Sequence, residues 1–202
     1  LCDDSMPMGM ESSQSWLVHF DNTFIPDEHI IGYPGQYLQE NWQTRTVPHY
    51  AATFYGGAQA AYHIALEYIK TQHKADDPYI QHRIGKMHIA LDTCDLWFQK
   101  VAHLWESGQQ DEAILAGSSL RYHVEQLTQE VVTHAIHCCG ARGLIRPGQL
   151  EKIARDLTFY ARHDNVDHVL ATVGKSLLGQ GANNNFYHHE QHRGDPAAAE
   201  KP

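Results

Sequence analysis

The residues best suited to chemistry lie in one stretch, between residues 140 and 174. Gly140-Ala141-Arg142-Gly143 closes an apolar helical pattern, and His163-Asp164-Asn165 interrupts the next one. A glycine turn lets a backbone approach a ligand closely, and a carboxylate whose pKa is raised by burial can abstract a proton. The plain alternative is a helix C-cap followed by an ordinary loop. Spacing alone leaves both interpretations open.

Sixteen histidines raise the question of a metal site. A di-iron bundle needs Glu-x-x-His pairs that face inward, whereas Glu130 and His134 are four residues apart. The run His188-His189-Glu190-Gln191-His192 lacks the spacing of a zinc-protease helix, and its polar surroundings are typical of a solvated tail. We therefore predict that no metal is bound. No glycine-rich stretch fits a P-loop or a dinucleotide-binding turn either.

Composition excludes several other classes of function. The 202 residues carry 15 basic and 24 acidic side chains, a net charge of −9, which argues against nucleic acid or an anionic membrane as a partner. No apolar run is long enough to cross a bilayer, and no signal peptide is apparent, so a cytoplasmic location is expected. The cysteines lack zinc-site or disulfide-framework spacing, and adjacent Cys138 and Cys139 are expected to be buried thiols.

Apolar periodicity organises most of the chain into helices. Residues recur at spacings of three and four, which is typical of one buried helix face. The expected helices cover residues 43–71, 80–105, 111–139, 147–160 and 166–178. Long helices joined by short connections predict a mostly α fold, an antiparallel four-helix bundle over residues 43–178. Gly56-Gly57 inside the first helix costs about 1 kcal/mol per glycine relative to alanine, which indicates a close approach there.

The two ends of the chain lack this pattern. Residues 1–42 are expected to form a loose N-terminus with a short β-appendage, because Trp16 to Phe20 alternates and Thr23-Phe24-Ile25 resumes an extended pattern. An isolated hairpin is marginal in water, so this appendage either packs on the helices or lacks a sheet partner. Residues 179–202 form a polar tail that we expect to be disordered.

Several short segments, in order, carry a family resemblance. They are Val18-His19-Phe20-Asp21-Asn22-Thr23-Phe24-Ile25-Pro26, Gly56-Gly57-Ala58-Gln59, Ile136-His137-Cys138-Cys139-Gly140-Ala141-Arg142-Gly143 and Arg155-Asp156. The third is similar to a Gln-x-x-Gly-Gly-x-Gly turn. Together they make residues from about 18 to 174 resemble the C-terminal part of an acyl-CoA dehydrogenase-family flavoenzyme, with the end of its middle β-domain and its helical bundle.

The resemblance implies a cofactor, partners and site residues. Family members bind FAD and form dimers or tetramers through the bundle, whose glycine turn approaches the FAD of a neighbouring subunit. It therefore implies cofactor contacts at His137, Gly140 and Gly143. A carboxylate removes the α-proton of an acyl-CoA-like substrate while hydride passes to the flavin. Asp164 falls at the catalytic position, with His163 setting its pKa or replacing it.

Departures from the family pattern leave alternatives open. His137 stands in place of the turn's usual Gln, and Asp164 in place of the usual Glu. The nitroalkane-oxidising branch uses Asp, and some flavin-dependent monooxygenases of this fold use His near this position. A third possibility is a non-catalytic helical subunit that completes another flavoprotein. Since most of the β-domain is absent, a partner subunit would supply it, and we expect this chain alone to bind FAD poorly and to turn nothing over.

Overall fold

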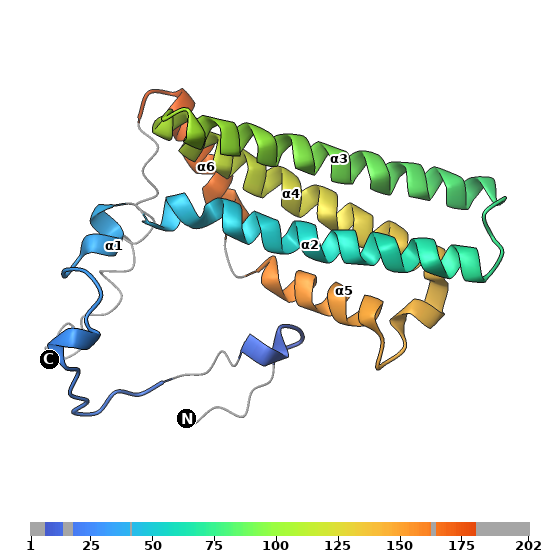
Figure 1. The fold of residues 1–202 in the computed structure, drawn as a ribbon, viewed down its shortest axis with the longest axis horizontal. Coiled ribbons are helices and arrows are strands. Elements are labelled where there is room, and N and C mark those ends of the chain that lie inside the picture. The colour runs from blue at the N-terminus through green and yellow to red at the C-terminus, as the bar shows by residue number, and fades with distance from the viewer. Residues whose placement is uncertain (1–6, 14–17, 41, 163–164, 181–202) are drawn as a thin grey trace, which may run out of the picture.

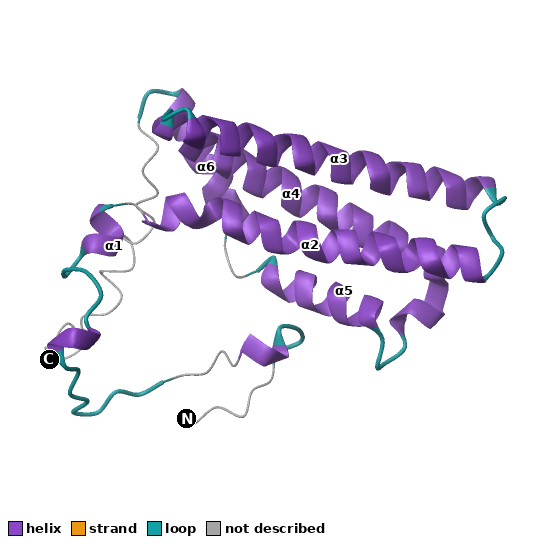
Figure 2. Ribbon diagram, in the orientation of Figure 1, coloured by secondary structure: helices purple, strands orange, loops and turns teal. Residues whose placement is uncertain are grey.

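The computed structural model describes residues 7–13, 18–40, 42–162 and 165–180. Figures 1 and 2 show that long helices dominate this part of the chain. The helices are α1 (Gln36–Gln39), α2 (Trp42–Thr71), α3 (Pro78–Glu106), α4 (Gln110–Cys139), α5 (Gln149–Tyr160) and α6 (Val166–Leu177), with short 3-10 turns η1 (Glu11–Ser13), η2 (Asp27–His29) and η3 (Gly140–Leu144). The prediction of a mostly helical fold is confirmed.

Helix α4 occupies the centre of the bundle. It packs against both α2 and α3 along most of its length, and the short helices α5 and α6 also contact it. In Figure 1, α5 lies beside α2, and α6 lies near the opposite end of the bundle from the α4–α5 turn. The antiparallel bundle is thus completed by two short helices rather than by one long fourth helix. The buried side chains include Phe54, Met87, Leu120 and Val124.

The ends of the helices follow from local chemistry. The Asp77 carboxylate accepts the backbone N–H groups of Tyr79 (2.8 Å) and Ile80 (3.3 Å), and so satisfies donors that the first turn of α3 leaves free. Gly108, with φ 76°, follows the end of α3, in the conformation that glycine adopts without strain. The Asn165 side chain caps α6 by accepting the N–H of Asp167 at 3.0 Å.

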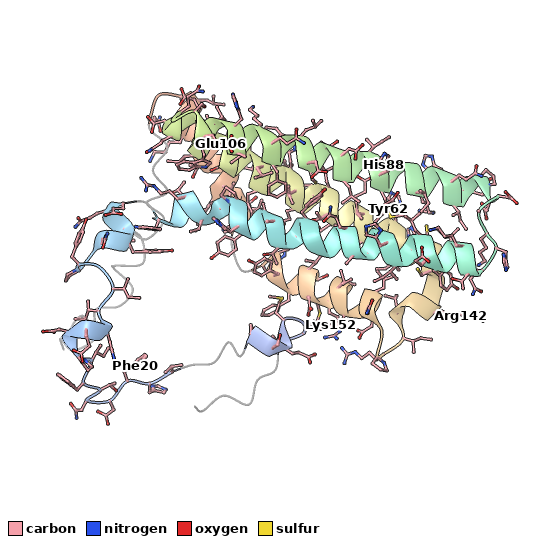
Figure 3. The ribbon with its side chains drawn as sticks, viewed as in Figure 1. Phe20, Tyr62, His88, Glu106, Arg142 and Lys152 are labelled. Atoms are coloured by element: carbon pink, nitrogen blue, oxygen red, sulfur yellow. The ribbon has the colours of Figure 1, made fainter. Side chains whose placement is uncertain are left out.

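The expected β-appendage is not formed in the described part of the chain. Val18 to Phe20 and Thr23 to Ile25 have no strand assignment, whereas Trp16 lies outside the described residues. Phe20 is 76 % exposed and Phe24 is 85 % exposed, and Figure 3 shows Phe20 far from the bundle. An extended segment becomes a strand only when a neighbour pairs with its backbone, and no such partner lies in the described residues.

The two glycines of α2 differ in their surroundings. A Cβ on Gly57 would come within 3.0 Å of Leu157 Cδ1, so this glycine lets α5 approach α2 closely. A Cβ on Gly56 would meet no atom within 4 Å. The close approach expected from this pair is therefore real at Gly57, and it is made by a side chain of α5.

Helix α4 contains a buried ion pair between two residues that are one helical turn apart. Arg121 and Glu125 are each 1 % exposed, and Arg121 Nη1 donates to Glu125 Oε2 at 2.5 Å. The guanidinium also lies over the Phe54 ring of α2, 4.7 Å from its centroid, where a cation is attracted to the aromatic face. Burying two charges is favourable only when they neutralise each other, so each of these side chains requires the other.

Removal of one partner of this pair should destabilise the bundle strongly. We expect Arg121→Met to lower the free energy of unfolding by about 3–5 kcal/mol, because the Glu125 carboxylate is left buried without its cation. The double variant Arg121→Met/Glu125→Leu should recover most of that loss. Denaturant unfolding followed by circular dichroism measures both changes.

The exposed pair Lys70–Glu67 provides a matched control. Lys70→Met should change the free energy of unfolding by less than about 1 kcal/mol. If the double variant at Arg121 and Glu125 were as unstable as the single variant, the packing of these side chains, rather than the pairing of their charges, would determine stability at this position.

Candidate functional site

The glycine turn begins where α4 ends. Gly140 has φ 64° and ψ −162°, which ends the helix, and an added Cβ there would meet no atom within 4 Å. Its backbone is exposed at the end of the bundle where Figure 3 shows Arg142. Gly140 therefore combines a backbone conformation that favours glycine with open space in front of it, the two properties that a ligand-contact turn needs.

Gly143 serves the packing of the turn itself. A Cβ on this residue would lie 2.7 Å from Cys139 Cβ and 2.9 Å from Leu150 Cδ2. Cys138 and Cys139 are 5 % and 4 % exposed, as expected, and burial raises the pKa of both thiols. Gly143 thus lets η3 fold back over the end of α4 and the beginning of α5.

His137 belongs to a polar cluster that joins α3 to α4. Arg83 Nη1 lies 2.8 Å from Nδ1 of His137 and 3.1 Å from Nδ1 of His134. Because a guanidinium can only donate, both Nδ1 atoms act as acceptors in this arrangement, and His134 is neutral when it accepts through this atom. Burial, partly offset by Glu130, lowers the pKa of His134 below its ordinary value, which favours the same neutral state.

The charges of this cluster do not cancel. Lys86 donates to Glu130 at 2.9 Å, and this hydrogen bond lowers the pKa of the Glu130 carboxyl despite some burial. Lys86 and Glu130 neutralise each other, whereas Arg83 contacts two imidazoles and no carboxylate of the described residues. A positive charge without an acidic partner in that part of the chain therefore lies beside His137, and Gly140 follows His137 by three residues. Arg83 was not singled out from the sequence, because its position in a helical pattern gave no sign that it faces α4.

The second half of the expected site, His163 and Asp164, lies outside the described residues. Its flanks are described and well anchored. Tyr160 is the last residue of α5. The centroid of its ring lies 5.0 Å from that of Phe54 and 6.0 Å from that of Tyr50. Arg162 Nη2 lies 4.0 Å from Glu125 Oε1, so the buried ion pair of α4 also faces the beginning of this junction.

Helix α5 lies between the glycine turn and residues 161–162, which precede the second half of the expected site in sequence. The glycine turn precedes α5 and the His163-Asp164 junction follows it. A helix of 12 residues rises about 18 Å, and Figure 1 shows α5 running away from η3. The glycine turn and the C-terminal end of α5 at Tyr160 therefore lie at opposite ends of this helix.

An apolar groove of about 390 Å³ lies elsewhere, between the beginning of α2 and the end of α3. It is lined by Arg45, Pro48, His49, Phe98, Val101, Ala102 and Trp105. None of these residues belongs to the turn or to the cluster around His137. Within the described ranges, no group of three or more His, Cys, Asp or Glu side chains could hold a metal ion, and no helix there is long and apolar enough to span a membrane.

Known proteins resemble this chain over most of its length. Cyclohex-1-ene-1-carbonyl-CoA dehydrogenase of Geobacter metallireducens is 26 % identical over 179 residues, covering 85 % of this chain and 47 % of that enzyme. Dibenzothiophene monooxygenase of Rhodococcus erythropolis is 24 % identical over 204 residues, covering 87 % of this chain and 49 % of the enzyme. The chain therefore spans about half the length of the curated relatives it matches.

Solved structures share the fold. Dibenzothiophene monooxygenase (TdsC) from Paenibacillus sp. A11-2 superposes with a TM-score of 0.74 at 22 % identity, covering 87 % of this chain and 51 % of that one. The same protein has been solved as a complex with FMN and indole. Residues 45–163 match the family described as acyl-CoA dehydrogenase, C-terminal domain. More than half of the chain is matched, and the chain belongs to the acyl-CoA dehydrogenase family through this C-terminal helical domain.

Proposed function

We propose that this chain is the flavin-contacting helical part of an acyl-CoA dehydrogenase-type oxidoreductase. The family match carries the proposal, and the open backbone at Gly140, three residues after the His137 ring that Arg83 contacts, supports it. A flavin nucleotide carries phosphate, which a guanidinium binds by charge-assisted hydrogen bonds. FAD is the cofactor implied by the family resemblance, whereas the solved relative TdsC was crystallised with FMN.

Different residues of the chain would contact different parts of the cofactor. Arg83 would turn from the two imidazoles toward the phosphate, and His137 would contact the cofactor at the edge of α4. The open Gly140 backbone would let the cofactor lie against the end of the bundle without meeting a side chain. When bound, the flavin supplies the hydride acceptor or the oxygen-activating group that the side chains of the protein lack.

The separation along α5 favours a homo-oligomer. The rise of α5 is about 18 Å, and from this rise and the family resemblance we infer that each chain contacts two flavins. The junction at His163-Asp164 would face the flavin of its own subunit, and the turn would face the flavin of a neighbour. A partner subunit that supplies the rest of the flavin site would be consistent with the same separation.

Two reactions fit the junction. In the first, Asp164 removes the α-proton of an acyl-CoA-like substrate, which requires burial to raise the pKa of its carboxyl. In the second, His163 serves a flavin-dependent monooxygenase, which the likeness to dibenzothiophene monooxygenases over 87 % of this chain favours. The two residues are adjacent, so substitution of each in turn distinguishes the reactions.

Substitution at the junction should identify the reaction in the complete flavoprotein. If acyl-CoA oxidation is the activity, Asp164→Asn should reduce anaerobic flavin bleaching by acyl-CoA by at least about 100-fold, while His163→Asn has a smaller effect. If oxygenation is the activity, reduced flavin should support oxygen-dependent product formation that His163→Asn abolishes. Normal turnover by both variants in both assays would contradict the assignment of this junction.

Arg83 should set the affinity for the cofactor phosphate. We expect Arg83→Gln to weaken FMN or FAD binding by about 10- to 100-fold, because a hydrogen bond to a charged group contributes about 1.5–3 kcal/mol. Riboflavin, which has no phosphate, should bind both forms of the protein equally. Flavin fluorescence quenching measures these affinities.

Arg45→Gln is the matched control, because it also replaces an arginine by glutamine, at a position that lines the apolar groove. It should leave FMN and FAD affinity unchanged. An Arg83→Gln protein that loses riboflavin and FMN affinity equally would show that Arg83 does not contact the phosphate.

A further inference from the structure

The N-terminal segment Met8 to Glu11 lies against the outer face of α5, although about 146 residues separate them in sequence. The backbone N–H of Met10 donates to Asp156 Oδ1 at 2.6 Å. Arg155 Nη1 donates to the carbonyl oxygen of Met8 at 2.9 Å and to Glu11 Oε1 at 2.8 Å. Figure 1 shows η1 directly beside α5. Two adjacent side chains of α5 therefore bind one N–H and one C=O of the same segment.

Gly9 brings the two backbones into contact. It is buried, and an added Cβ would lie 2.4 Å from the Arg155 carbonyl oxygen and 2.7 Å from the Asp156 nitrogen. Both atoms belong to the helix backbone and cannot rotate away. The contact therefore requires glycine at this position, whereas Gly56 of α2 faces open space.

The charges on α5 are arranged for this contact. Arg155 Nε also donates to Glu151 Oε2 at 2.7 Å, and this hydrogen bond raises the pKa of the guanidinium. Burial would raise the pKa of the Asp156 carboxyl, but hydrogen bonds from Lys152 and from the Met10 N–H outweigh it and leave the pKa below its ordinary value. Both side chains are therefore charged at neutral pH, which strengthens the hydrogen bonds they make.

We propose that the Arg155–Asp156 face of α5 is a docking site for a short, bent, glycine-containing segment, and that Met8 to Glu11 of this chain is its occupant. Recognition rests on backbone groups, on the glycine and on the acidic side chain of Glu11. The site couples the part of the protein before the bundle to α5, whose last turn leads into the junction at residues 163–164. This docking does not depend on the bound cofactor or on the reaction.

Hydrogen exchange on the full 202-residue chain tests this docking. In Gly9→Ala, amides of α5 (Gln149–Tyr160) should exchange about tenfold faster, because loss of one charge-assisted hydrogen bond destabilises the docked state by roughly that factor. Amides of α3 (Pro78–Glu106), which the segment does not contact, should keep the wild-type rate. Gly56→Ala is the matched control and should leave α5 exchange unchanged.

A second variant acts from the exposed side of the contact. Glu11→Gln removes only the charge that faces Arg155, and should accelerate α5 exchange less than Gly9→Ala and only at low salt. Wild-type α5 exchange in Gly9→Ala would overturn the proposal. Equal acceleration in α3 and α5 would also overturn it, since the segment would then stabilise the whole bundle and not α5 in particular.

Discussion

Burial of α4 is the constraint on which the rest of the structure depends. A helix of 30 residues that is covered by α2, α3, α5 and α6 must satisfy every polar group that it carries into the core. Most of these groups are satisfied within the helix, since Thr128 Oγ1 donates to the Val124 carbonyl oxygen at 2.6 Å and Arg121 Nη1 pairs with Glu125. Arg121 Nε is the exception, because it has no hydrogen-bond partner among the described residues. The end of this helix at Cys139 sets the position of the Gly140 turn.

Helix α5 contacts the glycine turn, helix α2 and the N-terminal segment. It begins after the glycine turn, it is held against α2 through Gly57 and Leu157, and it ends beside the Phe54 and Tyr50 rings. Its outer face also binds the N-terminal segment through Arg155 and Asp156. A displacement of α5 would therefore change the contacts at both of its ends, at Leu150 beside the glycine turn and at Tyr160 beside Phe54.

The helices could be predicted from the sequence because apolar periodicity is a local signal. The helix expected over residues 43–71 is Trp42–Thr71, and the one expected over 111–139 is Gln110–Cys139. The contact of Arg83 with His137 could not be predicted, because it depends on how α3 packs on α4 across 54 residues. The strand near Phe20 was wrong because extended propensity forms no strand without a partner. The roles of His163 and Asp164 remain sequence predictions.

A flavin titration followed by amide chemical shifts tests the central claim most directly. The chain labelled with ¹⁵N would be titrated with FMN or FAD at concentrations suited to weak binding, because the chain spans about half of its curated relatives. The account predicts shifts at Gly140 to Leu144 and at His137, with none at Val101 and Ala102 in the apolar groove. Shifts confined to the groove, or none at the turn, would contradict it.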